Sequence, residues 1–115
     1  AIEAYRLGKA TTQEWSDIVN MMNVTEHMAV RGVGPEAKQC CHDVYLHLIA
    51  AAKRYKTTRK MGTTGEGLQC FRDLYEWHNL QRTAVSRSEY ERHIQETVNR
   101  IRSGAPEVID AMEVV

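Results

Sequence analysis

The residues best suited to chemistry in this sequence are a thiol, a carboxylate and an imidazole on one flank of an expected helix. Cys40, Asp43 and His47 are spaced three and four residues apart, and residues at that spacing lie on one face of a helix. These side chains are ligand types of a zinc site, or the members of a thiolate–imidazole pair. A zinc ion would need further ligands from another helix, with His78 or His93 as candidates. The alternative is a half-buried thiol beside a local pair of Asp43 and His47.

Other signatures of enzymes and cofactor sites fail on geometry or spacing. Cys41, His42 and Asp43 are consecutive, so on a helix they point about 100° apart and cannot converge on one reacting atom. No glutamate is followed three residues later by a histidine, as carboxylate-bridged di-iron bundles require. The glycines at 62–67 lack the Lys-Ser/Thr pair of a P-loop. The sequence therefore favours a non-enzymatic protein with no metal site and no cofactor.

The strongest charge feature is a basic segment at residues 53–60. It contains five cations and no acidic residue, whereas the whole chain balances 15 basic against 15 acidic residues. Cations in the last turn of a helix offset the negative end of its dipole, which explains part of the cluster. The number exceeds that need, so the segment predicts a binding surface for an anionic partner. Its members are Lys53, Arg54, Lys56, Arg59 and Lys60.

Two features of this segment favour a protein partner, with nucleic acid as the alternative. Tyr55 is its one aromatic residue. This residue belongs to the apolar stripe that should face the core, so nucleic-acid bases have no exposed ring on which to stack. The segment also leads into an apolar helix, whereas a helix-turn-helix motif would continue into a polar recognition helix.

Trp77 is the candidate contact residue on the helix expected after the basic segment. Interface centres are rich in tryptophan and tyrosine. The apolar residues of this helix cover more than half of its circumference, so it is either the central helix of the fold or a helix with one side against a partner. We expect that partner to include a second copy of the chain, in a homodimer with Trp77 at the contact. The apolar residues are Leu68, Phe71, Leu74, Tyr75 and Trp77.

The positions of these residues follow from helical periodicity along nearly the whole chain. A short first helix should end at Gly8, and capping boxes predict later helix starts at Thr11, Thr63 and Ser86, each with glutamate three residues on. A further helix should open at Pro35, after two glycines that stop the one before it. Apolar residues at helical spacing predict the buried face of each helix. They are Trp15, Ile18, Val19 and Met22 in the helix that starts at Thr11, and Ala37, Cys41, Val44, Leu48, Ala52 and Tyr55 in the helix that opens at Pro35. In the helix that starts at Ser86 they are Tyr90, Ile94, Val98 and Ile101.

These elements predict an all-α, single-domain bundle over residues 1–115. It should have four main helices and a short extra helix at each end, the last one through Val108, Ile109 and Met112. No apolar run approaches the roughly 20 residues that span a bilayer, and no signal peptide opens the sequence. Three cysteines, two of them adjacent, do not form a disulfide framework. We therefore expect a cytoplasmic protein that binds no membrane.

The first 32 residues resemble the start of small proteins encoded by bacteriophages and prophages of proteobacteria. Those proteins pair a short helix ending in a Gly-x-x-Thr-like step with a tryptophan-containing helix and an asparagine before the next turn. The matching positions are Gly8, Thr11, Trp15 and Asn20 or Asn23. The resemblance implies an accessory protein of a mobile element. Small helical proteins of that origin often bind and obstruct a bacterial host protein, CRISPR machinery included.

The sequence predicts that folding needs neither a metal nor a disulfide. A chain of this length buries enough surface to fold by its own core. The far-ultraviolet circular dichroism spectrum should therefore be predominantly helical, and it should not change when a chelator and a reductant are added together. Loss of helical signal under those conditions would contradict the prediction.

Overall fold

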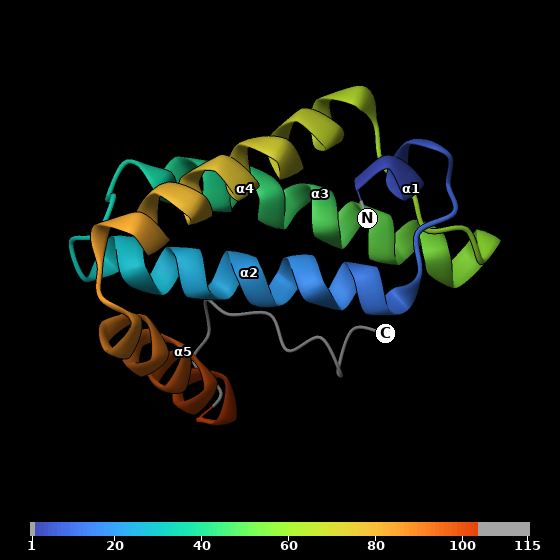
Figure 1. Ribbon diagram of the computed structural model, residues 1–115. Coiled ribbons are helices and arrows are strands. Elements are labelled where there is room, and N and C mark those ends of the chain that lie inside the picture. The colour runs from blue at the N-terminus through green and yellow to red at the C-terminus, as the bar shows by residue number, and fades with distance from the viewer. Residues whose placement is uncertain (1, 104–115) are drawn as a thin grey trace.

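The computed structural model describes residues 2–103, with side chains described from Ala4 onwards, and shows five α-helices and no β-strand in that range (Figure 1). The helices are α1 (Ile2–Arg6), α2 (Thr12–Val30), α3 (Ala37–Thr58), α4 (Gly65–Ala84) and α5 (Arg87–Arg102). This confirms the all-α class and the four main helices. The short helix expected through Val108, Ile109 and Met112 lies outside the described residues. No helix of the described range has the length and apolar character needed to cross a membrane.

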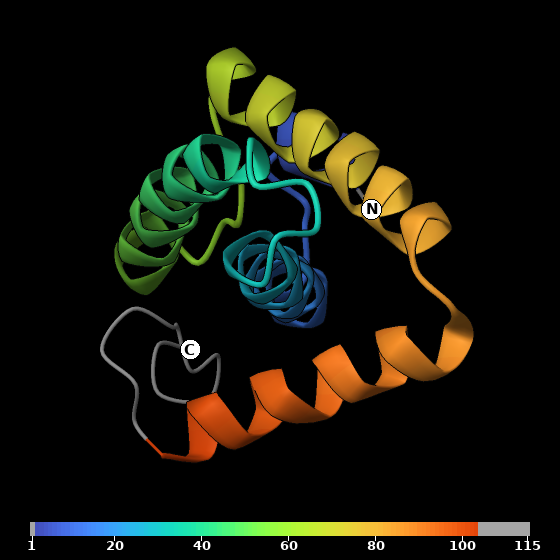
Figure 2. The ribbon, with the colours of Figure 1, turned by 90° about the vertical axis from the view of Figure 1, so that its left-hand side faces the viewer.

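The central helix is α2. Figure 2 shows it end-on, with α3 and α4 on one side and α5 on the other. Its apolar positions Ile18, Val19 and Met22 are buried, as the periodicity predicts. Trp15 is also buried, and its indole N–H donates to the carbonyl oxygen of Leu48 at 3.0 Å, which joins α2 to α3. The apolar helix α4, expected to be either central or partner-facing, packs against α1, α2 and α3.

The clearest stripe of the sequence, on α3, forms one wall of the core. Five of its members are buried and Tyr55 is half-buried, which confirms the predicted face. Outside this stripe, α3 exposes Tyr45 and Leu46. On the facing helix, Phe71 is buried and its ring meets the ring of Tyr5 edge-on at 5.1 Å, which places α1 against α4. The core members of α3 are Ala37, Cys41, Val44, Leu48 and Ala52.

Local capping signals place most of the helix starts. Thr11 and Ser86 each form the complete capping box with the glutamate three residues on. The box predicted at Thr63 is wrong, because Thr64 caps α4 through a bond from the Gly67 N–H at 3.1 Å. The reason is a long-range contact: the backbone N–H of Thr63 donates to the carbonyl of Tyr5, which keeps the chain extended for one more residue.

The turn between α2 and α3 uses glycine for its backbone conformation. Gly32 and Gly34 have φ values of 90° and 62°, a region that residues with a Cβ atom rarely adopt. Pro35 is also part of this turn, so α3 begins at Ala37 and not at Pro35 as expected. The side-chain amide of Gln81 fastens the turn to α4, donating to the carbonyl of Val33 at 3.0 Å.

The predicted buried face of α5 is wrong by about one residue of rotation. Ile94 is 36% exposed, while His93 and Thr97 are buried at 5% and 2% exposure. The physical reason is that α5 is held against α2 by polar side chains, beginning with a hydrogen bond of 2.9 Å between His27 and Glu96. Those bonds, and not the apolar stripe, set the rotation of α5.

The packing of Leu48 gives a stability prediction. Leu48→Ala should lower the free energy of unfolding by about 2–5 kcal/mol, because it leaves a cavity in a closed core. The control is Leu46→Ala on the same helix, where the side chain is 53% exposed and the change should stay within about 0.5 kcal/mol. Urea denaturation measures both. A loss below about 1 kcal/mol at Leu48 would contradict the assignment of this face to the core.

Candidate functional site

The cations of the basic segment lie on the surface at the end of α3. Lys53, Arg54, Lys56, Arg59 and Lys60 are all exposed. Within residues 2–103, none of these five cations forms an ion pair with an acidic side chain. Their charge is therefore directed to solvent, as a binding surface for an anion requires.

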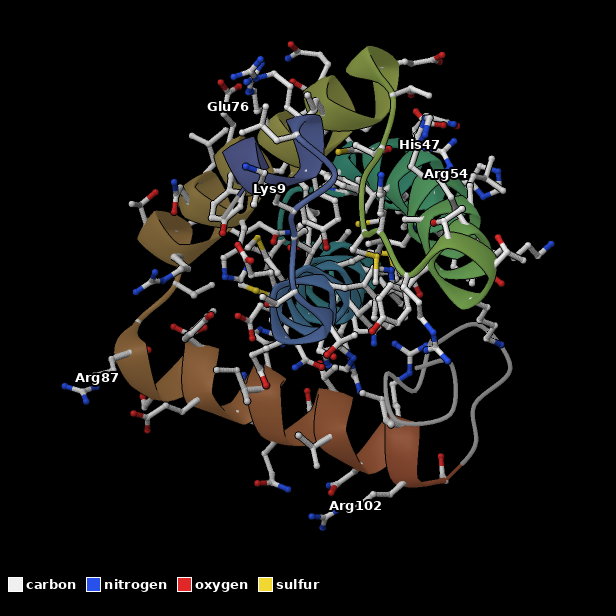
Figure 3. The ribbon with its side chains drawn as sticks, turned by 90° about the vertical axis from the view of Figure 1, so that its right-hand side faces the viewer. Lys9, His47, Arg54, Glu76, Arg87 and Arg102 are labelled. Carbon is white, nitrogen blue, oxygen red and sulfur yellow. The ribbon has the colours of Figure 1, made fainter. Side chains whose placement is uncertain are left out.

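The turn after α3 holds these cations in place and adds another one. The hydroxyl of Thr58 donates to the carbonyl of Arg54 at 2.8 Å and accepts from the N–H of Lys60 at 3.2 Å. Met61 pairs through its backbone with Lys9, so the link between α1 and α2 runs beside the basic segment. Figure 3 looks onto this end of the molecule, with Lys9 beside α1 and Arg54 on α3 at different sides of the view. We call Lys9 together with the five cations of 53–60 the basic end.

The aromatic residue of the segment is not available for stacking. Tyr55 is half-buried against the core. The guanidinium of Arg59 lies 5.6 Å from the centre of its ring, in a cation–π contact. The basic end therefore offers charge without a platform for nucleic-acid bases.

The thiol, carboxylate and imidazole on α3 do not form one site. Asp43 accepts a hydrogen bond from Gln39 at 3.0 Å, where a local pair with His47 was the alternative expected from the sequence. His47 lies instead against Gly67 at the start of α4. The thiol of Cys40 contacts the carbonyl oxygen of Cys70 at 3.9 Å.

The cysteines are also poor nucleophiles in this environment. All three, which include Cys70, are free thiols. Burial, together with a smaller effect of the Asp73 carboxylate, raises the pKa of Cys40 to about 11. Burial raises the pKa of Cys41 to about 12. The reactive thiolate is therefore a very small fraction of each cysteine at neutral pH, so the raised pKa values give no support to a cysteine nucleophile.

Trp77 lies in a pocket of about 410 Å³ between α3 and α4. The indole is half-buried, and the adjacent Leu80 is 60% exposed. Four carboxylates share the pocket with these apolar groups, so its charge is opposite to that of the basic end. The homodimer with Trp77 at its contact stays a prediction. The acidic residues of the pocket are Glu36, Asp43, Asp73 and Glu76.

His78, the first zinc-ligand candidate from another helix, has both ring nitrogens engaged. Nδ1 shares a hydrogen bond of 3.1 Å with the hydroxyl of Thr25, and Nε2 shares one of 2.9 Å with the hydroxyl of Tyr90. Burial lowers the pKa of His78, and the nearby Arg82 cation lowers it further. This histidine joins α2, α4 and α5 as a neutral hydrogen-bonding group.

His93, the second candidate, belongs to a cluster that the sequence analysis missed. His27 on α2 and His93 on α5 are 2% and 5% exposed, and the partly exposed Glu96 lies beside both. One potential ligand atom from each lies within 4.8 Å of the other two, and among residues 2–103 this is the group that meets a metal-site geometry. His93 followed three residues later by Glu96 is the signal available in the sequence. Nothing local marks His27.

Charged side chains surround this cluster. Arg31 lies 3.9 Å from Glu96, and Arg100 lies 3.4 Å from Nδ1 of His27. The hydrogen bond with His27 is the main reason that the pKa of the Glu96 carboxyl is lowered. Burial lowers the pKa of His93, and His27 lowers it further. We call His27, Arg31, His93, Glu96 and Arg100 the α2–α5 polar cluster.

No protein-family model, curated protein or solved structure matches this chain. Function therefore has to be inferred from the surfaces and clusters described above.

The environment of His78 predicts a pH-dependent stability. Because the folded-state pKa is lowered, the unfolded chain binds the proton first as the pH falls below about 6.5. The contribution of His78 to stability is complete above that pH, and below it declines by up to about 1.4 kcal/mol per pH unit. Urea denaturation from pH 7.5 to 5.0 should therefore show a smaller pH slope for His78→Gln than for the wild type. Equal slopes would contradict this role.

Proposed function

We propose that this protein is a non-enzymatic interaction module that binds an acidic face of a bacterial protein or protein complex through its basic end. In this proposal it inhibits or regulates that complex in the cytoplasm, as an accessory protein of a phage or another mobile element.

The observation that carries the proposal is the exposure, at one end of the molecule, of cations from two separate segments that form no ion pair within the part of the chain that the structure describes. Lys60 and Lys9 flank the backbone pairing at Met61, and the members of the basic end within 53–60 have no acidic partner among the described residues. Like charges held close together repel one another, so a cluster without internal compensation is stabilised by an external anionic surface.

The class of partner rests on two further arguments. The ring of Tyr55 is half-buried and already holds Arg59 in a cation–π contact, so it is a poor platform for the base stacking that single-stranded nucleic acids use. This supports a protein surface over a nucleic acid. The resemblance of the first 32 residues to phage and prophage proteins supports a bacterial host as the source of that surface.

A charge reversal at the basic end tests the proposal. Arg59→Glu with Lys60→Glu should leave the free energy of unfolding within about 0.5 kcal/mol of the wild type, because both side chains are exposed. The affinity for a partner captured from bacterial lysate and then purified should fall at least tenfold, about 1.4 kcal/mol, because the reversal sets like charges against each other. Calorimetry with the purified partner measures it.

The matched control reverses two exposed cations elsewhere, Lys38→Glu and Arg102→Glu, and should bind the partner like the wild type. Duplex DNA titrated at several salt concentrations tests the alternative. Three to five phosphate contacts would give a slope of log affinity against log salt of roughly −3 to −4.5. A partner affinity unchanged by the reversal at Arg59 and Lys60 would overturn the proposal. Binding to DNA with this steep salt dependence would instead identify nucleic acid as the partner.

A further inference from the structure

The α2–α5 polar cluster brings together two imidazoles and a carboxylate from distant parts of the chain. His27 comes from α2, and His93 and Glu96 come from successive turns of α5, where a spacing of three residues puts them on one face. Neutral imidazole and carboxylate are the nitrogen and oxygen ligands that zinc and neighbouring transition metals take in proteins.

The distances within this group fit a single bound ion. Ligand atoms bound at about 2.0–2.2 Å with tetrahedral angles lie about 3.3–3.6 Å apart. Nε2 of His27 is 2.9 Å from Oε1 of Glu96, and Nδ1 of His93 is 3.8 Å from the same oxygen, so the observed distances lie on either side of that value. The two rings meet edge-on at 66° with centres 5.5 Å apart. Shifts of side-chain torsion angles are therefore enough to bring the ligands into place.

His93 supplies an independent sign that a partner is missing from this cluster. Its Nδ1 atom is buried and has no hydrogen-bond partner within residues 2–103. The contact with Glu96 at 3.8 Å is too long for a hydrogen bond. An unsatisfied buried nitrogen destabilises the fold, by about the desolvation penalty of the group. A metal ion on this lone pair would satisfy it.

The cluster also opens to solvent on one side. A pocket of about 350 Å³ is lined by Val33, Arg92, His93 and Glu96, among others. It borders His93 and Glu96, so an ion would approach from this side, and it leaves room for water in the remaining coordination position. The geometry points to a divalent zinc-class metal site formed by His27, His93 and Glu96, which fastens α5 to α2.

Two arginines contact the proposed ligands, and a bound metal ion would have to displace both contacts. Nδ1 of His27 lies 3.4 Å from the guanidinium of Arg100, which can only donate, and Nε2 lies 2.9 Å from Glu96, so a neutral His27 in this geometry carries its ring proton on Nε2. Metal binding at Nε2 moves that proton to Nδ1, and Arg100 then turns to Glu26, whose carboxylate already lies 4.0 Å away. Arg31 has an exposed side chain and contacts Glu96 only at 3.9 Å, so it can leave for solvent.

Nuclear magnetic resonance of the imidazole nitrogens tests the site on the unaltered protein. The chain has five histidines, and one equivalent of zinc ion should shift the ring ¹⁵N signals of His27 and His93 alone. His42 and His47 on α3 serve as internal controls. A shift at His47 in their place, or no shift at either proposed ligand with zinc in excess, would overturn the proposal.

Variants separate coordination from general stabilisation. Glu96→Gln keeps the size of a partly exposed side chain and should weaken zinc binding at least tenfold in calorimetry, because an amide oxygen carries no charge. Arg31→Gln should strengthen binding severalfold, since it removes a competing cation next to the carboxylate. A structural hydrogen-bond cluster without a metal would show no such opposite changes, so equal zinc affinities in both variants would overturn the site.

A thiol control excludes the cysteines as the source of zinc binding. Cys40→Ser with Cys70→Ser should retain the wild-type zinc affinity, and loss of binding in this variant would move the site to the pocket between α3 and α4. Zinc at a hundredfold excess over its dissociation constant should also raise the thermal midpoint by at least about 5 °C in the wild type. An unchanged midpoint would count against the site.

Discussion

Each of the other long helices packs against α2, so this helix has to satisfy three different neighbours at once. Its first half does so with apolar groups around Trp15, Ile18 and Met22, which fill the space toward α3 and α4. Its second half buries polar groups as well, among them Thr25 and His27. Buried polar atoms need partners, and therefore the second half of α2 determines which side chains of α4 and α5 can lie next to it.

The division of α2 gives the molecule two kinds of packing. The contact of the first half of α2 with α3 and α4 is largely apolar and closed, and such cores permit few rearrangements. The contact with α5 runs through His27, Glu96 and Arg100, and its geometry depends on charges and protons. Because hydrogen-bonded charges respond to bound ions far more than apolar contacts do, α5 is the element whose attachment a ligand can strengthen without disturbing the core.

Charge is distributed over the surface in a way that keeps the proposed binding surface separate from this cluster. The basic end lies where α3 terminates beside Met61, whereas the α2–α5 polar cluster lies at the other face of α2. The acidic pocket around Trp77 lies between α3 and α4. The cations of the basic end are exposed, so they can be substituted without disturbing the core, as a test of binding requires.

The sequence by itself determined the helical class, the core stripe on α3 and the capping boxes at Thr11 and Ser86. It also located the cations that the structure exposes. These features depend on residues within about four positions of one another, which a linear pattern records. Only the tertiary structure decided the rotation of α5 and the meeting of His27 with Glu96, which are 69 residues apart. The apolar stripe of α5 predicted a different buried face, because periodicity assumes that a helix packs by its apolar residues, whereas the unsatisfied polar groups at the end of α2 required a polar partner.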